Sequence, residues 1–122
     1  MPALRLAGYS LAPGLLDNAE VVREWFVILA AELGVHIVNG PTIHSFKESG
    51  MPEAGLSAFA IIAESHMCLH TWPEKRWVMT EIVSCKDFDV DKAERLALQQ
   101  FSIGEVTKRQ ADPDWGAPPK GA

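Results

Sequence analysis

Apolar residues recur along two segments with the period of an α-helix. The first segment begins at Asp17 or Asn18, either of which can cap a helix, and ends at Gly34. Its apolar positions fall on one face: Val22, Trp25, Phe26, Leu29 and Leu33. The second segment follows Asp87 or Asp89. Its apolar positions form a similar stripe: Val90, Ala93, Leu96, Ala97 and Phe101. The sequence therefore predicts two amphipathic helices.

Shorter apolar or alternating segments between these helices predict β-strands. Residues 56–63 form a near-continuous apolar run, as in a central strand buried on both faces. Further strands are expected at 4–9, 36–46 with a break at 39–41, 77–84 and 104–110. The resulting order is β-α-β-β-β-α-β. It predicts an α+β fold, a two-layer sandwich with an antiparallel sheet and two helices packed on one face.

Length and composition suit one folded unit. The chain has 122 residues, of which 48% are hydrophobic and 22% are charged, as in an ordinary globular domain. We expect a single domain over residues 1–111. Residues 112–122 are rich in proline and glycine, and we expect them to form a flexible C-terminal tail.

The charge pattern limits the partners. The net charge is -5, and basic residues gather only in the isolated pairs at 75–76 and 108–109, so a nucleic-acid partner is not expected. No apolar run approaches the roughly 18–20 residues that span a bilayer, and the N-terminus lacks the features of a signal peptide. We therefore expect no membrane association and a cytoplasmic location, where Cys68 and Cys85 would be reduced thiols.

Reactive side chains are densest at residues 63–74, which read Ala-Glu-Ser-His-Met-Cys-Leu-His-Thr-Trp-Pro-Glu, with Cys85 shortly after them. This segment resembles the self-cleavage and active-site motif of the prokaryotic S-adenosylmethionine decarboxylases, whose common form is E-S-H-x-S-x-H-T-W-P-E. The close match covers residues 56–85, and the His-Ser-Phe at 44–46 matches an H-x-F motif of the family.

The resemblance implies that Ser65 is the precursor of a cofactor. In this family the serine hydroxyl attacks the carbonyl of the preceding residue, here Glu64, and the peptide bond becomes an ester. Loss of the serine α-proton then divides the chain between 64 and 65. His70 matches the histidine that takes this proton. Ser57 matches a hydroxyl that helps to stabilise the intermediate, although it could equally be an ordinary hydrogen-bonded strand serine.

The new N-terminus implied by the family is a pyruvoyl group derived from Ser65. Its ketone forms a Schiff base with a substrate amine and accepts the electrons released with carbon dioxide, so no metal and no added cofactor is expected. Cys85 matches the general acid that protonates the product, since a thiol is mostly protonated at neutral pH. A lone cysteine is otherwise more often a small buried hydrophobe.

Substrate recognition is implied for three further positions. Phe46 matches an aromatic residue that stacks on adenine, and Trp72 and Glu74 match residues that line the substrate site. Core packing is the alternative interpretation for Phe46 and Trp72. The family thus implies S-adenosylmethionine as the small-molecule substrate, a role in polyamine (spermidine) biosynthesis, and a homodimer of cleaved protomers with active sites near the interface.

Several departures from the family pattern permit other functions. A longer loop follows Phe46, Cys68 replaces a serine, Glu81 replaces an aspartate, and Lys86 replaces a glycine after the cysteine. Pyruvoyl-dependent decarboxylation of another amino acid, ornithine or arginine, is therefore an alternative. A non-catalytic paralogue is a second alternative.

A zinc-binding module is the alternative from another class. His66, Cys68 and His70 alternate, so in an extended segment they point to one face, and Cys85 could complete a tetrahedral site. Zinc binding explains neither the Glu-Ser pair at 64–65 nor the Trp-Pro-Glu at 72–74, so we favour the decarboxylase.

Overall fold

The computed structural model describes residues 2–112 and 114. Its elements, in chain order, are β1 (Ala3–Ser10), the 3-10 turn η1 (Pro13–Asp17), α1 (Ala19–Leu33), β2 (Ile37–Ser45), β3 (Leu56–Ile62), β4 (Ser65–Trp72), the 3-10 turn η2 (Pro73–Lys75), β5 (Trp77–Ser84), α2 (Val90–Gln100) and β6 (Ile103–Asp112). Of the expected tail, Asp112 ends β6, whereas 113 and 115–122 lie outside the described residues.

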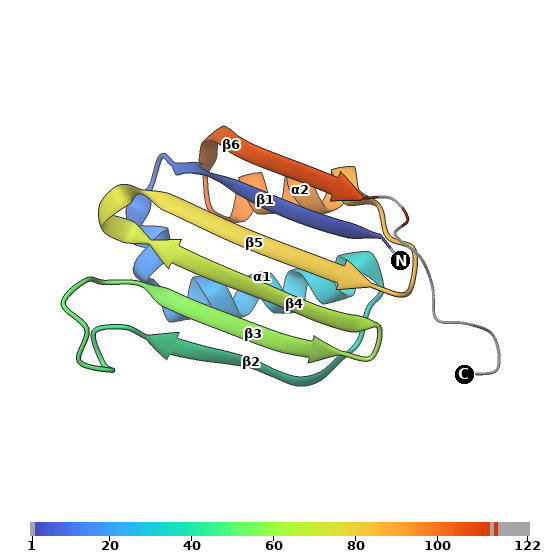
Figure 1. The fold of residues 1–122 in the computed structure, drawn as a ribbon, viewed down its shortest axis with the longest axis horizontal. Helices are drawn as coiled ribbons and strands as arrows, with labels where there is room; N and C mark the ends of the chain where they lie inside the picture. Colours follow the sequence, from blue (N-terminus) through green and yellow to red (C-terminus); the bar gives the residue numbers. More distant parts are fainter. Residues whose placement is uncertain (1, 113, 115–122) are drawn as a thin grey trace.

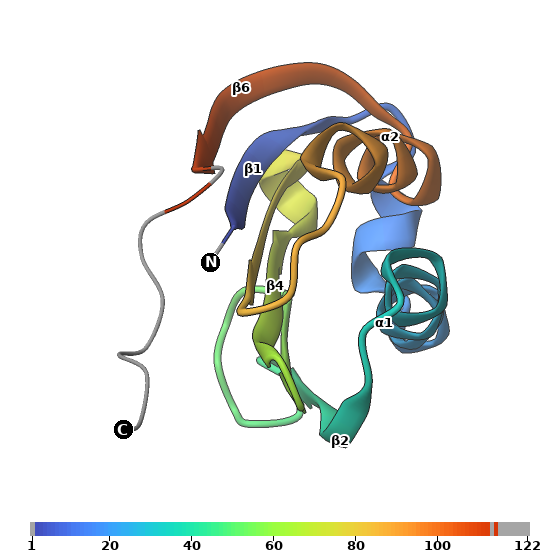
Figure 2. The same ribbon diagram turned by 90° about the vertical axis from the view of Figure 1, so that its right-hand side faces the viewer.

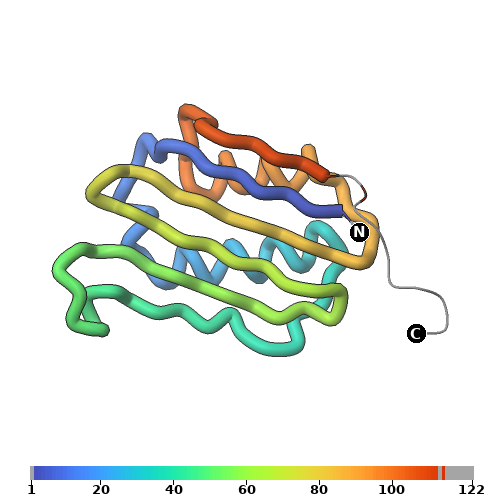
Figure 3. The backbone as a smooth tube through the Cα atoms, in the orientation of Figure 1, coloured from blue at the N-terminus to red at the C-terminus, as the bar shows by residue number. Residues whose placement is uncertain are grey.

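The six strands form one antiparallel sheet in the order β2-β3-β4-β5-β1-β6. Strands β2 to β5 follow one another as a meander, and β1 lies between β5 and β6 (Figures 1 and 3). Seen from the edge, α1 and α2 both cover the same face of this sheet (Figure 2). The predicted two-layer α+β sandwich is therefore confirmed. Among the described residues, no helix is long and apolar enough to cross a membrane.

Side-chain caps set the N-terminal ends of both helices. The Asn18 carboxamide oxygen accepts hydrogen bonds from two backbone N–H groups in the first turn of α1. Gly34 follows that helix in a left-handed conformation with φ of 70°, which glycine adopts without steric cost. Asp89 caps α2 in the same manner as Asn18 caps α1. Phe101, expected within the second helix, instead follows its last turn and remains fully buried.

The core fills the space between the helices and the sheet. Trp25 of α1 meets Phe101 edge to face, with ring centroids 5.6 Å apart, and this contact joins the two helices. The indole N–H of Trp25 donates to the Thr80 hydroxyl at 3.4 Å, and that hydroxyl donates to the Cys68 carbonyl at 2.8 Å. The polar atoms buried in this layer are thus hydrogen-bonded to the sheet beneath them.

The structure has one strand more than the sequence pattern predicts. The reactive segment forms β4, which pairs with β3 on one side and β5 on the other. Its alternate residues Met67, Leu69 and Thr71 are buried toward the helices. The intervening residues face the opposite side of the sheet, which we call the open face. Strand β2 also continues through 39–41, where its pairing with β3 shifts register.

Candidate active site

The Glu64–Ser65 peptide bond lies where the tight turn at 63–64 joins β3 to β4. Ser65 is the first residue of β4 and has a φ of 157°, close to a fully extended backbone. It pairs with Ser84, the last residue of β5. The turn and the C-terminal end of β5 therefore lie at the same end of the strands (Figure 1). This places Cys85, the residue after β5, beside the turn.

A short hydrogen bond joins Cys85 to this turn. The backbone N–H of Cys85 donates to the carbonyl oxygen of Glu64 at 2.7 Å. That oxygen belongs to the peptide bond between Glu64 and Ser65, and it would carry the negative charge if a nucleophile added to the carbonyl carbon. A donor already aimed at this oxygen can stabilise such a charge. The Cys85 side chain is exposed. The predicted site residues Glu64, Ser65 and Cys85 thus lie close together.

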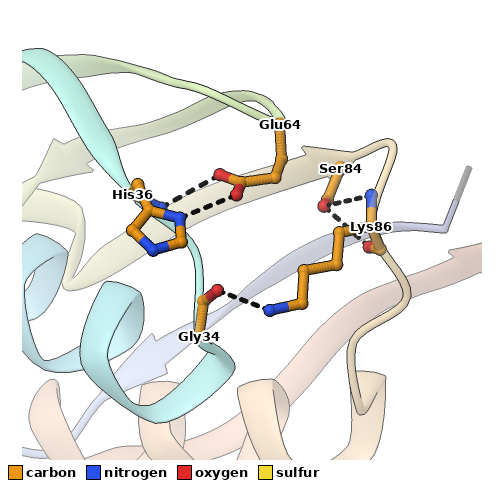
Figure 4. Close-up of polar contacts among 5 residues, drawn as sticks. All are labelled: Gly34, His36, Glu64, Ser84 and Lys86. Carbon is orange, nitrogen blue, oxygen red and sulfur yellow. Dashed lines mark hydrogen bonds and ion pairs between the residues drawn. The ribbon is translucent and has the colours of Figure 1, made fainter.

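The Glu64 carboxylate is held by His36, which precedes β2 (Figure 4). One carboxylate oxygen accepts the backbone N–H of His36 at 3.0 Å, and the other lies 2.9 Å from its ring Nδ1. The hydrogen bond from the His36 ring holds the pKa of the Glu64 carboxyl below its ordinary value. The sequence carried no signal for this residue, because the pairing depends on how the segment after α1 meets the hairpin.

Ser57 and His70 form a second cluster, on the open face. They are directly paired residues of β3 and β4, and the Ser57 hydroxyl lies 2.9 Å from the His70 ring Nδ1. The ring of Trp72, two residues further along β4, lies 6.3 Å from the His70 ring. Both residues of the pair line a shallow pocket of about 510 Å³. The structure therefore joins the serine and the histidine predicted to assist self-cleavage.

The two clusters are far apart within one chain. Ser65 and His70 occupy the first and sixth positions of β4, and a strand rises about 3.3 Å per residue, so roughly 16 Å separates their backbones. Figure 1 shows the same separation, because the β3–β4 turn and the β4–β5 connection lie at opposite ends of β4. His70 cannot reach the α-proton of Ser65 in its own chain in this arrangement.

The residues predicted to bind substrate accompany His70. Phe46 follows β2, and its backbone N–H donates to the Gly55 carbonyl at 2.9 Å. A Cβ atom at Gly55 would lie 3.0 Å from the Phe46 ring, so glycine permits this close packing. Glu74 is in η2, two residues after Trp72. All three predicted substrate residues therefore lie near the end of β4 that is remote from Ser65.

A charged network between the clusters was missed by sequence reasoning. On the open face, Glu81 of β5 accepts from the Arg5 Nε–H at 2.8 Å and lies 3.1 Å from His66 Nε2. Burial acts to raise the pKa of Glu81, but the hydrogen bonds of His66 and Arg5 oppose it, and the net pKa is lowered. Arg5 could not be identified beforehand, because it meets Glu81 only through the β1–β5 register.

The alternating residues of β4 do point to one face, as the zinc alternative requires. However, no group of three or more His, Cys, Asp or Glu side chains in the described part of the chain is arranged to hold a metal ion. Cys85 lies at the turn, not beside His70. Burial, followed by the negative charge of Glu81, raises the pKa of the Cys68 thiol, which disfavours the thiolate that zinc binds.

Comparison with solved structures supports the fold. The adenosylmethionine decarboxylase from Aquifex aeolicus superposes with a TM-score of 0.78 at 16% sequence identity, covering 99% of this chain and 94% of that one. The chain is thus a two-layer α+β protein with the fold of that decarboxylase.

Sequence comparison shows the family. A model of the S-adenosylmethionine decarboxylase family matches residues 4–113. The S-adenosylmethionine decarboxylase proenzyme of Parasynechococcus marenigrum is 30% identical over 104 residues, covering 76% of this chain and 77% of that protein. The proenzyme of Pyrococcus horikoshii is 37% identical over 90 residues, covering 73% of this chain but only 60% of that protein. The chain belongs to the S-adenosylmethionine decarboxylase family, as its motif predicted.

Proposed function

We propose that this chain is a self-processing, pyruvoyl-dependent decarboxylase that acts on S-adenosylmethionine in polyamine biosynthesis. The observation that carries the proposal is the hydrogen bond from the Cys85 N–H to the Glu64 carbonyl, which forms the peptide bond to Ser65. It sets a nucleophile, an electrophilic carbonyl and an oxyanion donor at one peptide bond, which is the arrangement that an intramolecular acyl shift requires.

Self-cleavage begins when Ser65 Oγ adds to the Glu64 carbonyl carbon and the carbonyl oxygen becomes an oxyanion facing the Cys85 N–H. Collapse of this adduct breaks the C–N bond and leaves an ester between the Ser65 Oγ and Glu64. Removal of the Ser65 α-proton then expels Glu64 as a carboxylate and leaves a dehydroalanine. Its enamine tautomerises to an imine, and water releases ammonia to leave the pyruvoyl end. Bond making and breaking balance without an added oxidant or metal.

In our proposal, the base that removes the Ser65 α-proton comes from a second copy of the chain. His70 lies too far from Ser65 within one chain, and it shares the open face with apolar side chains such as Phe59 and Ile61, which are 47% and 46% exposed. Packing two open faces in opposite directions would cover these residues. It would also bring His70 of the partner subunit, with its Ser57, beside the Ser65–Cys85 cluster. We therefore propose a homodimer in which each site uses both chains.

The residues around position 65 fit a pyruvoyl group. Ser65 lines a pocket of about 370 Å³ at the start of β4, together with the open-face residues Arg5, His66 and Glu81, so a carbonyl formed there has room for a substrate amine. When formed, the group supplies an electron sink for decarboxylation. Cys85 is beside this position and exposed, so its thiol can deliver a proton to the substrate carbon after carbon dioxide leaves.

The substrate would be recognised by residues of the partner subunit that lie near the end of β4 remote from its own Ser65. Phe46 and Trp72 of the partner subunit would offer aromatic faces, which suit both an adenine ring and a sulfonium cation. The Glu74 carboxylate of the partner subunit could accept hydrogen bonds from ribose hydroxyls. A cytoplasmic location, expected from the sequence, stays a prediction.

Intact mass of the freshly purified protein under denaturing conditions tests self-processing. We expect two fragments split between 64 and 65, the second carrying a pyruvoyl end, and one uncut chain for Ser65→Ala. An uncut wild-type chain after long incubation would contradict the proposal. Carbon dioxide release from S-adenosylmethionine, ornithine and arginine then identifies the substrate, because only the first offers an adenine to the aromatic residues. Release from ornithine or arginine alone would support the alternative activity.

A further inference from the structure

The connection between α1 and β2 contacts both the turn that precedes the proposed cleavage point and the loop that carries Cys85 (Figure 4). His36 makes three contacts with the turn at 63–64. Its backbone N–H and ring Nδ1 engage the two oxygens of the Glu64 carboxylate at 3.0 and 2.9 Å. Its carbonyl oxygen accepts the Ala63 N–H at 2.8 Å. The turn is thus held by a residue that belongs to neither of the strands it joins.

The same connection also holds the loop that carries Cys85. The Lys86 ammonium group donates to the Gly34 carbonyl at 2.8 Å. The Ser84 hydroxyl accepts the Lys86 N–H at 3.0 Å and donates to the Lys86 carbonyl at 2.7 Å. The residues on either side of Cys85 are therefore fixed, and the position of its N–H relative to His36 is fixed with them.

We propose that His36 is a positioning residue for self-cleavage, holding the Glu64 carbonyl against the Cys85 N–H so that Ser65 can attack it. The inference rests on the proposed function and adds to it a residue that acts through Glu64. His36 touches none of the reacting atoms. It constrains the side chain of Glu64 and the preceding amide, while the Cys85 N–H constrains the carbonyl, so the peptide plane between Glu64 and Ser65 has little freedom to rotate.

Exposure argues that this contact serves geometry more than stability. The His36 side chain is 74% exposed, whereas that of Glu64 is 11% exposed beneath it. A pair that is so open to water on one side contributes little to the free energy of unfolding. A misplacement of about 1 Å between reacting groups, however, can slow a reaction by about 10²-fold. Loss of the His36 ring should therefore affect cleavage far more than folding.

The test is the rate of self-cleavage of newly synthesised precursor, followed by denaturing mass spectrometry. His36→Ala should slow cleavage by about 10-fold to 100-fold. His36→Asn places an amide N–H where ring Nδ1 stood and should restore the rate to within about threefold of wild type, since it keeps the donor. Lys92→Ala is the matched control. Like Lys86, Lys92 donates to a carbonyl near the end of α1, that of Glu32, but it does not reach the turn.

Two further readouts separate positioning from a structural role. The melting temperatures of the His36→Ala and Lys92→Ala chains, each combined with Ser65→Ala so that it stays uncut, should agree closely. A His36→Ala/Glu64→Ala double variant should cleave no more slowly than the slower single variant, because His36 acts through Glu64. Equal rates for wild type and His36→Ala, or additive losses in the double variant, would overturn the inference. Equally slow cleavage by the Ala and Asn variants would overturn it too. An uncut wild-type chain would instead refute the proposed function itself.

Discussion

The backbone N–H of Cys85 donates to the carbonyl oxygen of Glu64, with 2.7 Å between nitrogen and oxygen, and the thiol of the same residue is exposed. Two groups of one residue can therefore serve two different reactions. In the proposed mechanism, the N–H would stabilise charge on the carbonyl oxygen during self-cleavage, whereas the thiol would serve as the general acid in decarboxylation afterwards. Because a substitution of the side chain leaves the N–H in place, the two roles can be separated by mutation.

Cys85→Ala should therefore cleave but turn over poorly. We expect the two fragments to form, since the hydrogen bond to Glu64 is made by the backbone. Turnover should fall by about 10²-fold or more, the usual scale for loss of a general acid. Denaturing mass spectrometry measures the first outcome, and carbon dioxide release from S-adenosylmethionine measures the second.

Cys68→Ala is the matched control for this prediction. Cys68 is half-buried on β4, and its raised pKa keeps the thiol protonated, but it does not contact the turn. The control should cleave normally and retain most activity. Normal turnover by Cys85→Ala would remove the thiol from the mechanism and leave only the backbone role.

The His36–Glu64 contact should give the uncut precursor a pH-dependent stability. The pKa of Glu64 is lowered in the folded chain, below the ordinary 4.5, by its hydrogen bond with His36. A lowered folded pKa means that the unfolded state binds the proton more tightly. The stabilising contribution is therefore present above the unfolded pKa and is lost as the pH falls through the folded pKa.

The comparison should be made between Ser65→Ala and Ser65→Ala/Glu64→Gln, neither of which can self-cleave. The melting temperature of the first should exceed that of the second by a small amount near pH 7, because the contact is open to water on one side, and the difference should shrink as the pH is lowered to about 2. Glu81 also has a lowered pKa, but it is present in both proteins, so its titration cancels. A difference that stays constant with pH would show that the contact is not carried by the carboxylate.

Phe101 should be a principal determinant of stability. Its ring is fully buried against Trp25 and joins α2 to α1. Phe101→Ala should lower the free energy of unfolding by about 3–5 kcal/mol, because it removes a large buried side chain and leaves a cavity. Val27→Ala is the control, because Val27 is 56% exposed on the outer side of α1. It should change the free energy of unfolding by about 0.5 kcal/mol or less. Chemical denaturation measures both.

The helices were predictable because their signals are local. Asn18 begins α1 through a side-chain cap, and Gly34 ends it through a left-handed turn. Both features depend only on nearby residues. The strand β4 was not predicted, although its signal is also local. Its buried residues alternate with His66, Cys68 and His70, so the period of two was present, but the polar positions were interpreted for their chemistry instead.

The site was only partly predictable because its geometry depends on strand register. The motif identified Ser65, His70 and Cys85, yet no spacing rule shows that Ser65 and His70 lie at opposite ends of one strand until that strand is recognised. His36 carried no signal, because it meets Glu64 only through the packing of the α1–β2 connection on the β3–β4 turn. Contacts between elements remote in sequence are what the pattern alone leaves open.

A site shared between two chains predicts that two inactive variants can rescue each other. Ser65→Ala lacks the proposed nucleophile but keeps the Ser57–His70 pair, whereas His70→Ala keeps Ser65 and Cys85 but lacks the proposed base. In a mixed dimer, His70 of the Ser65→Ala subunit would meet Ser65 of the other subunit and complete one site. Coexpression of the two variants with different tags should therefore yield cleaved His70→Ala chains, while neither variant cleaves when expressed alone.

The control is coexpression of Ser65→Ala with a Ser65→Ala/His70→Ala chain, which offers no serine to either site and should remain uncut. Mass spectrometry of each tagged chain distinguishes the products, because only the His70→Ala chain can be cut. Cleavage of His70→Ala expressed alone would show that His70 is dispensable. Failure of the mixed sample, with mixed dimers present by size and tag, would show that His70 of the partner subunit does not serve Ser65, and would contradict the shared site. Rescue would mean that the distance between Ser65 and His70 along β4 is bridged by a second copy of the protein.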